Sequence, residues 1–283
     1  MATILSARRR RIGQLLNPLA AARHLWRQRE LIAQFTRREI EGRYRGSFLG
    51  LFWSLAQPLF MLAIYTIIFG VVFRSRWPQA RSESLAEFAL TVFAGLIAYT
   101  LFSESVGRAA GLIVGVPNYV KKVVFPLEIL PFSVVGAALF HLLVSIVVLI
   151  AAQLVLVGSL PWTIIFLPLV LLPLLCFSLG MMWLIASLGV FVRDIGQLVA
   201  IVLQGLFFFT PIFYSIDMIP EPLRSLILIN PMAPITENFR RVLLWGTLPS
   251  FAGLGLWLLA TLGFMLLGYA WFMQTKKAFA DVL

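Results

Sequence analysis

Few residues of this 283-residue chain have the type and spacing needed for catalysis. It contains no G-x-x-x-x-G-K-[ST] phosphate-binding loop, so any ATP hydrolysis that drives the protein requires another chain. The carboxylates of Asp217, Glu221 and Glu237 are too scattered along the sequence to indicate an acid/base pair. Since His, Cys and carboxylates do not cluster, the sequence also predicts no metal centre. The sequence therefore gives little support to an enzyme.

Two single residues lie within apolar runs. A lone His such as His141 usually hydrogen-bonds a neighbouring helix, and a proton relay is the alternative. The apolar runs carry no central carboxylate, which argues against a proton-driven mechanism. Cys176 is the only cysteine, so no intrachain disulfide can form, and we expect it to pack as a small apolar residue.

The composition is that of an integral membrane protein. The chain is 60% hydrophobic and only 12% charged, whereas soluble domains have about a quarter of their residues charged. Its mean hydropathy is +0.94. The net charge of +11 could indicate nucleic acid binding, but the basic residues crowd the N-terminus, which fits a cytoplasmic membrane face better. We therefore expect an all-α membrane protein that binds membrane lipids and no nucleic acid.

Six apolar runs have about the length that a helix needs to cross ~30 Å of hydrocarbon. The fourth run is too long for one straight span and must tilt, protrude or break near Pro168 and Pro173. The expected spans cover residues 52–73, 85–102, 130–157, 162–191, 195–213 and 251–273.

The basic residues predict the orientation of these spans. With a cytoplasmic N-terminus, most of the 23 Lys and Arg fall on the inside, as the positive-inside rule requires. We expect both termini in the cytoplasm, with residues 1–50 as an N-terminal segment, 51–275 as the membrane domain and 276–283 as a tail. No apolar stretch follows the first basic residues, so we expect no signal peptide and a mature chain that starts at Met1.

Residues 103–128 form the longest expected cytoplasmic connection between spans. Its valines 116, 120, 123 and 124 recur at helical spacing beside Lys121 and Lys122. A short interfacial helix that presents its lysines to water or to a partner explains this pattern. A basic anchor on anionic lipid also explains it and is the interpretation that the charge pattern alone favours, although the pattern leaves both open.

Two further segments are amphipathic. Residues 18–50 mix apolar residues with Arg and Glu, as expected for a helix along the cytoplasmic interface. Residues 214–250 are too polar for a span, but Leu223–Ile229 and Ile235–Leu244 each offer a short apolar face. We expect a pair of short re-entrant helices there, and a surface loop on the outer leaflet is the alternative.

Four motifs resemble one known family. They are RREIEGRYRGSFLGLFWSLAQPLFMLAIYTIIFG (37–70), YVKKVVFPLEILP (119–131), FVRDIGQLV (191–199) and FTPIFYSIDMIPEPLRSLILINPMAPITENFRRVLL (209–244). In this order they are similar to the membrane subunits of bacterial ABC polysaccharide exporters, the Wzm-like O-antigen, capsule and teichoic-acid permeases. The resemblance extends over nearly the whole chain from about residue 25.

The resemblance implies a permease rather than an enzyme. Two copies of the permease would form a channel in the bacterial inner membrane, and two separate ATPase subunits would bind ATP and Mg²⁺ and drive export of a lipid-linked polysaccharide such as O-antigen. No cofactor is expected on this chain. A permease for a drug or lipid is the alternative within the same fold, and a membrane-embedded glycosyl- or acyltransferase is an alternative from another class.

The resemblance also implies roles for particular residues. Residues 118–128 would form a coupling helix in a groove of the ATPase, and residues 192–196 a second cytoplasmic contact. The ATPase-coupling residues would be Asn118, Tyr119, Lys121, Lys122, Phe125, Pro126, Glu128, Arg193 and Asp194. An interfacial gate helix beside the headgroup entrance would carry Arg37, Arg38, Glu39, Arg43, Tyr44 and Arg45.

Aromatic residues recur along the first expected span and crowd the outer end of the fifth. Each alone is more often a lipid-facing or interface residue than a ligand contact. Sugars present CH-rich faces that stack on aromatic rings, so we expect some of these rings to line the pore. The candidates are Trp53, Phe60, Tyr65, Phe207, Phe208, Phe209, Phe213 and Tyr214.

Overall fold

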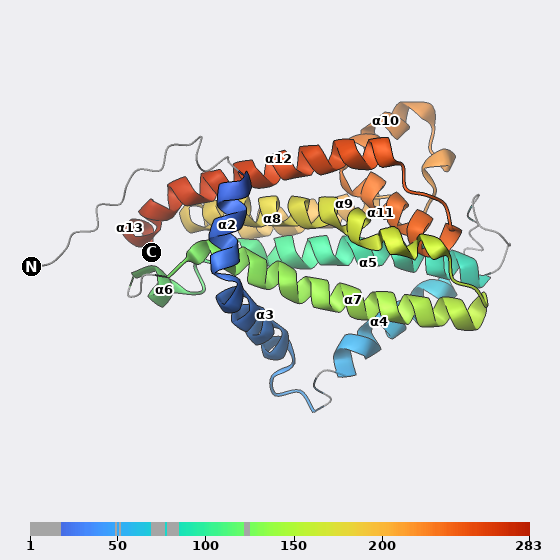
Figure 1. The fold of residues 1–283 in the computed structure, drawn as a ribbon, viewed down its shortest axis with the longest axis horizontal. Coiled ribbons are helices and arrows are strands. Elements are labelled where there is room, and N and C mark those ends of the chain that lie inside the picture. The colour runs from blue at the N-terminus through green and yellow to red at the C-terminus, as the bar shows by residue number, and fades with distance from the viewer. Residues whose placement is uncertain (1–17, 49, 51, 69–76, 78–84, 122–124) are drawn as a thin grey trace, which may run out of the picture.

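The computed structural model describes residues 18–48, 50, 52–68, 77, 85–121 and 125–283. These residues form helices, turns and connections, and no strand occurs among them. Four helical stretches in this part of the chain are long and apolar enough to cross a membrane. They contain the helices α5 (Leu85–Ala109), α7 (Leu130–Leu156), α8 (Leu167–Phe191) and α12 (Phe251–Thr275). Figure 1 shows these four helices side by side, and they form the body of the bundle.

Two shorter apolar helices complete the bundle. They are α4 (Phe52–Tyr65), which packs against α5 and α7, and α9 (Ile195–Phe209), which packs against α5 and α8. α9 stops four residues before the end of the fifth predicted span, because Thr210 is already extended before Pro211. The end of the first predicted span, residues 69–73, lies outside the described residues.

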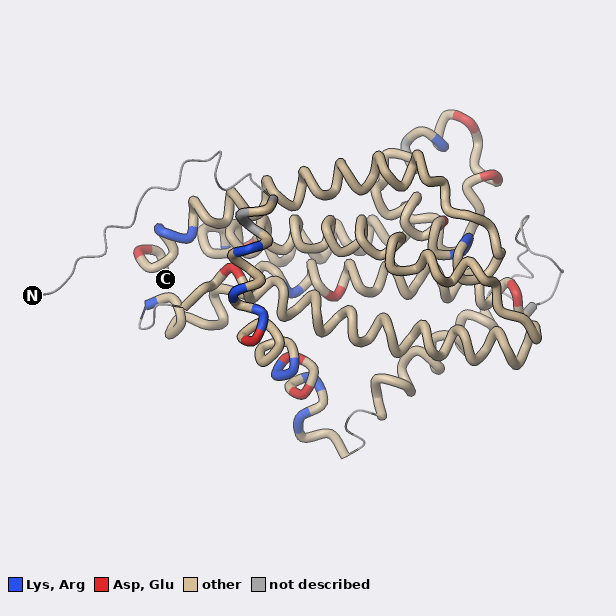
Figure 2. The backbone as a smooth tube through the Cα atoms, viewed as in Figure 1, with Lys and Arg blue, Asp and Glu red and all other residues tan. Residues whose placement is uncertain are grey.

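Of the long helices, α5, α8 and α12 run toward the same end of the bundle, and α7 runs in the opposite direction (Figure 1). Several short elements and the C-terminus therefore gather at one end of the bundle. Figure 2 shows Lys and Arg concentrated at this end and along α3, so we call it the basic end. The short elements near it are α2 (Pro18–Arg27), α3 (Arg29–Tyr44), α6 (Pro117–Lys121), the 3-10 turns Leu127–Ile129 and Lys276–Ala278, and α13 (Phe279–Val282).

Helices α8 and α12 make the largest helix-to-helix contact in the bundle. They approach most closely where Gly268 faces Gly180. A Cβ atom on Gly268 would lie only 2.5 Å from the carbonyl oxygen of Gly180. The lack of a side chain therefore allows this close packing between two apolar helices.

The second and fourth predicted spans differ in detail from the structure. α5 continues to Ala109, seven residues beyond the predicted end at 102, because Ser105, Val106 and Ala109 are buried against the bundle. The fourth predicted span divides at Phe166/Leu167 into a 3-10 turn (Trp162–Phe166) and α8. This change of helix type just before Pro168 fits the break that was predicted there, whereas α8 passes through Pro173 without interruption.

The connection between α9 and α12 forms short helices, as the sequence predicted. They are the 3-10 turn Ile216–Met218, α10 (Glu221–Ile229), α11 (Met232–Arg240) and a π-helical turn, Arg241–Trp245. α11 packs on α5 and is largely buried. These elements lie at the end of the bundle opposite the basic end (Figure 1). Their depth in a bilayer stays a prediction.

Candidate functional site

Two adjoining cavities lie beside α3. The first, which we call the vestibule, has a volume of about 1180 Å³ and is lined by α3, α5 and α7. The second, the inner cavity, has a volume of about 390 Å³ and lies deeper in the bundle between α4, α5, α7 and α9. The boundary residues, which line both cavities, are Arg43, Ser103, Glu104, Ala138 and His141.

Two ion pairs join α3 to α5 at the vestibule. Both terminal nitrogens of Arg43 donate to the carboxylate of Glu104, at 2.9 and 2.7 Å. In the second pair the arginine is on α5 and the glutamate on α3, and Arg108 donates to Glu39. Exposure of 34% and 23% for the first pair and 52% and 26% for the second leaves all four side chains in contact with water. The pairs are therefore specific in geometry but accessible to solvent ions.

The boundary also contains a hydrogen bond between Tyr44 and His141. The Tyr44 hydroxyl lies 3.2 Å from Nδ1 of His141, and the two rings meet edge-on at 5.7 Å. Burial raises the pKa of Tyr44, and the hydrogen bond to Glu104 raises the pKa of Arg43. At neutral pH the boundary thus combines a phenol with a guanidinium. The prediction that His141 hydrogen-bonds another helix is confirmed, since Tyr44 belongs to α3.

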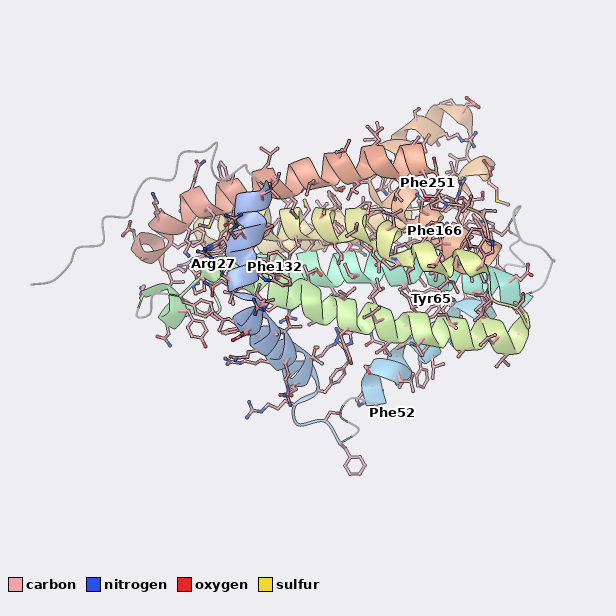
Figure 3. The ribbon with its side chains drawn as sticks, viewed as in Figure 1. Arg27, Phe52, Tyr65, Phe132, Phe166 and Phe251 are labelled. Carbon is pink, nitrogen blue, oxygen red and sulfur yellow. The ribbon has the colours of Figure 1, made fainter. Side chains whose placement is uncertain are left out.

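Several aromatic rings line the inner cavity. Tyr65 of α4, Tyr99 of α5 and Phe207 of α9 line it, together with the amide of Gln204. Phe213 extends the cluster, because its ring centroid lies 5.5 Å from that of Tyr65 and 5.3 Å from that of Phe207. Ring faces beside a few hydrogen-bonding groups suit a ligand that has both apolar and polar parts. Figure 3 labels Phe52, which is exposed at the start of α4, and Tyr65, which is the last residue of α4.

A cluster of three rings fixes α6 to α3. Tyr119 and Phe125 stack at 4.7 Å with an angle of 18° between their planes. Phe35 of α3 packs against both, at centroid distances of 6.0 and 5.2 Å. Arg38 adds a hydrogen bond of 3.3 Å to the Tyr119 hydroxyl. The wall of the vestibule is thereby connected directly to the segment around α6.

Glu128 connects four parts of the basic end. Its carboxylate accepts hydrogen bonds from His24 of α2 at 2.8 Å and from Lys276, after α12, at 2.6 Å. Its backbone oxygen accepts the indole N–H of Trp183 on α8 at 3.1 Å. The side chain is only 4% exposed. The ammonium group of Lys276 and the hydrogen bond with His24 compensate the burial of this carboxylate.

A model of the ABC-2 type transporter family matches residues 30–244. This chain belongs to the ABC-2 type transporter family. The matched region starts in α3 and ends in the turn after α11, so it contains the residues that line both cavities. It stops before α12.

The names of several proteins similar to this ABC-2 transporter are more specific than the family description. The chain is 33% identical to an O-antigen export system permease protein RfbA of Myxococcus xanthus over 80% of this chain and 85% of the relative. It is 28% identical to an RfbA protein of Klebsiella pneumoniae over 90% and 95%. It is 26% identical to a polysialic acid transport protein KpsM of Escherichia coli over 85% and 92%.

The predicted gate-helix residues of this ABC-2 transporter have different surroundings. Arg37 is exposed and pairs with Glu41 on the same helix at 2.7 Å. Tyr44 lines the inner cavity. The residues that line the vestibule are Arg38, Glu39, Arg43 and Arg45. Their role as a gate stays a prediction.

The predicted ATPase-coupling residues that the structure describes belong to the basic end. Asn118 and Lys121 are exposed on α6, and Arg193 and Asp194 are exposed in the turn between α8 and α9. Tyr119, Phe125 and Glu128 instead make the internal contacts described above, and Pro126 is half-buried between them. Lys122 lies outside the described residues. Contact of any of them with an ATPase stays a prediction.

The predicted pore aromatics divide into two groups. Tyr65, Phe207 and Phe213 belong to the ring cluster of the inner cavity, and the Tyr214 hydroxyl donates to the backbone oxygen of Phe208 at 2.9 Å. The others are exposed on the outer faces of α4 and α9, and they are Trp53, Phe60, Phe208 and Phe209. Their role as pore-lining residues stays a prediction.

Sequence reasoning missed two residues of the vestibule. Glu104 and Arg108 lie four residues apart on α5, in a stretch that was assigned to a loop. Their spacing, directly after an apolar run, is a helical signal that could have extended the predicted helix. Their partners on α3 could not be predicted, since the two pairs join residues 61 and 69 positions apart.

Proposed function

We propose that this chain is the channel-forming permease subunit of an ATP-driven transporter that exports a lipid-linked polysaccharide, with O-antigen as the proposed glycan. The observation that carries the proposal is the pair of adjoining cavities, in which an arginine-rich vestibule leads to an aromatic inner cavity. Such a pair suits an amphiphile with an anionic headgroup and sugar rings. The relatives named as O-antigen export permeases support the choice of glycan.

The proposed topology has six spans with both termini in the cytoplasm of a bacterium. Four helical stretches have the required length, and α4 and α9 supply the other two crossings. The helical stretch that begins with α4 continues to Ile68. With 15 residues α9 reaches about 23 Å, so it requires a locally thinned bilayer or flanking residues that complete the crossing. The concentration of Lys and Arg at the basic end supports a cytoplasmic position for that end, and the proposed location is the inner membrane.

The proposed partners are a second copy of this chain and two ATPase subunits, which carry ATP and Mg²⁺. Large apolar side chains are exposed along α4 and α9, and these faces are available to a second copy in a shared channel. At the basic end, α6 and the turn at Arg193 and Asp194 are the proposed docking elements for the ATPase. The sequence contains no phosphate-binding loop of its own, in agreement with this division of labour.

Deletion of the gene in its own bacterium tests the proposed function. We expect the surface polysaccharide to disappear and the lipid-linked glycan to accumulate in the inner membrane, because synthesis continues without export. Immunoblotting of surface glycan and extraction of lipid-linked intermediates would measure both effects. A plasmid copy of the gene should restore the surface polysaccharide and remove the accumulated intermediate. Normal surface polysaccharide in the deletion strain would contradict the proposal.

Replacing two rings of the inner cavity should reduce export. We expect Tyr65→Ala with Phe207→Ala to lower surface polysaccharide about tenfold, because each lost stacking contact contributes on the order of 0.5–1.5 kcal/mol. Quantified surface glycan, normalised to permease in the membrane, measures the effect. Trp162→Ala with Trp271→Ala is the matched control, since both rings are exposed and neither lines the cavity. Equal effects of the two double variants would contradict a glycan path over these rings.

A further inference from the structure

We infer that the ion pair between Glu128 and Lys276 is a positioning contact for ATP-driven transport: it fixes the segment proposed to dock on the ATPase to the helix pair α8 and α12, so that they move as one body. We call α6 together with residues 125–129 the docking segment. The inference rests on the proposed function and adds to it a route by which movement of the ATPase reaches the membrane helices.

The pair is buried where the docking segment ends. Glu128 is the middle residue of the turn Leu127–Ile129, and its side chain is 4% exposed. Both flanking residues of the turn are buried as well. A buried carboxylate is unfavourable unless it is paired. The ammonium group of Lys276, at 2.6 Å, therefore stabilises a position in which Glu128 points into the protein, and the part of Glu128 in coupling is internal.

The side chain and the backbone of Glu128 reach the same two helices. Lys276 directly follows α12, and the backbone oxygen of Glu128 accepts the indole N–H of Trp183 on α8 at 3.1 Å. The two helices are also bonded to each other, because the hydroxyl groups of Ser187 on α8 and Thr275 on α12 lie 2.7 Å apart. The docking segment is thus bonded to two helices that already form one unit.

The C-terminal tail adds a second contact to the docking segment. After Lys276 the chain turns and forms α13, which contacts both α6 and α8. Phe279 of α13 is 0% exposed, and its ring centroid lies 5.5 Å from that of Phe272 and 5.9 Å from that of Phe191. The ends of a chain are usually poorly ordered unless they are packed. Phe279 therefore holds the tail between the docking segment and the same helix pair.

These contacts determine which helices follow the docking segment. The chain itself connects the segment to α5 and α7, and the ring cluster connects it to α3. The Glu128–Lys276 pair adds α12, although the two residues are 148 positions apart. A force on the exposed side chains of Asn118 and Lys121 then displaces α8 and α12 together with α7. Without the pair, the segment can move relative to α12.

Lys276→Gln tests the pair, because it removes the charge and retains a hydrogen-bond donor. We expect the glycan exported per ATP hydrolysed to fall about fivefold, as is typical of contacts that couple two sites. The ATPase should still co-purify and hydrolyse ATP, since the exposed face of α6 is unchanged. Surface glycan normalised to permease, and ATP hydrolysis by the purified permease–ATPase complex, are the measurements. Lys276→Arg keeps the charge and should export normally.

Lys277→Gln is the matched control. Lys277 is the next residue, it is exposed, and it forms no ion pair with a described residue, so this variant should export normally. If export, bound ATPase and the midpoint of thermal unfolding all fall together in Lys276→Gln, the pair only stabilises the fold and the inference is wrong. Normal export by Lys276→Gln would overturn it as well.

A second measurement uses the unaltered pair. Spin labels on Val114→Cys, in the turn before α6, and Gln274→Cys, near the end of α12, report a distance in the permease–ATPase complex with a Cys176→Ala background. We expect this distance to be the same with and without ATP and vanadate, and to change with ATP when Lys276→Gln is added. A distance that changes with ATP while the pair is intact would contradict movement as one body, and so would equal behaviour of the two proteins.

The outcomes separate this inference from the proposed function. Loss of export on gene deletion, with normal export by Lys276→Gln, would remove only the positioning role of the pair. Normal export on gene deletion would remove the proposed function itself.

Discussion

Arg240→Met is expected to lower the free energy of unfolding by about 3 kcal/mol, since it removes two hydrogen bonds from a charged donor that has no access to water. Arg240 is 0% exposed. Its Nε donates to the backbone oxygen of Thr91 at 3.0 Å, and an Nη donates to that of Ile212 at 2.8 Å. Its guanidinium also lies over the ring of Trp77 at 4.3 Å. Arg240 thereby holds α5, α11 and the turn after α9 together.

Burial lowers the pKa of Arg240 to about 10, so the side chain remains charged at neutral pH. The charge is compensated by the two carbonyl dipoles and by Glu237, whose carboxylate lies 3.7 Å away. Methionine has a similar length and no charge, so it removes these interactions with little change in volume. The midpoint of thermal unfolding of the detergent-purified chain measures the loss.

Arg241→Met is the matched control for this prediction. Arg241 is the next residue, 39% exposed, and its pair with Glu237 spans 4.0 Å. Such a pair contributes about 0–1 kcal/mol, so the control should unfold close to the wild-type temperature. Equal destabilisation by the two variants would show that burial of the guanidinium is not the cause.

Gly95 provides an independent check of the same site. A Cβ atom there would lie 2.7 Å from a terminal nitrogen of Arg240, so Gly95→Ala forces the guanidinium to shift. We expect Gly95→Ala to destabilise the wild type more than it destabilises Arg240→Ala, in which the space is free. Such non-additivity is typical of residues in direct contact.

The apolar helices were predictable because their length and composition leave few alternatives in a membrane. α7 covers Leu130–Leu156 where 130–157 was expected, and α12 covers Phe251–Thr275 where 251–273 was expected. The end of α5 was not found, because a search for uncharged runs stops at Glu104. Its last two turns carry charge on one side and buried Val106 and Ala109 on the other. Amphipathic periodicity, and not hydropathy, was the signal to read there.

The candidate site was predictable only in part, because many of its contacts join residues that lie far apart in the sequence. Sequence motifs identified α3 and the segment around α6 as separate elements of interest. They did not reveal that Phe35 joins the two, nor that Glu128 is bonded inside the chain to His24 and Lys276. These contacts join residues more than 80 positions apart, and no local periodicity specifies them. Arg240 had no sequence signal at all, since an arginine beside an apolar run is usually an interfacial residue.

Reversing the charge of Lys121 and Lys122 together is expected to abolish export. α6 is held on α3 by Tyr119, whereas Lys121 and Asn118 are exposed. Lys121→Glu with Lys122→Glu therefore changes what the segment presents to a partner without removing the ring cluster that anchors it. If the segment docks in a groove of the ATPase, charge repulsion should prevent docking. Co-purification of the ATPase and surface polysaccharide are the two measurements.

The alternative for this segment is a basic anchor on anionic lipid, and it predicts another result. Loss of two lysines at a membrane surface costs about 1 kcal/mol each in lipid attraction, which a bundle of long apolar helices withstands. Export and co-purification would then be normal. Arg27→Glu with Lys277→Glu is the matched control, because both residues are exposed at the basic end and the change in charge is the same. A photo-crosslinker at position 118 should react with the ATPase in the wild type. If no crosslink forms, and the lysine variant still retains the ATPase and exports glycan, the segment is a lipid anchor. The contact that couples the permease to the ATPase then lies elsewhere, and the exposed turn at Arg193 and Asp194 is the next element to test.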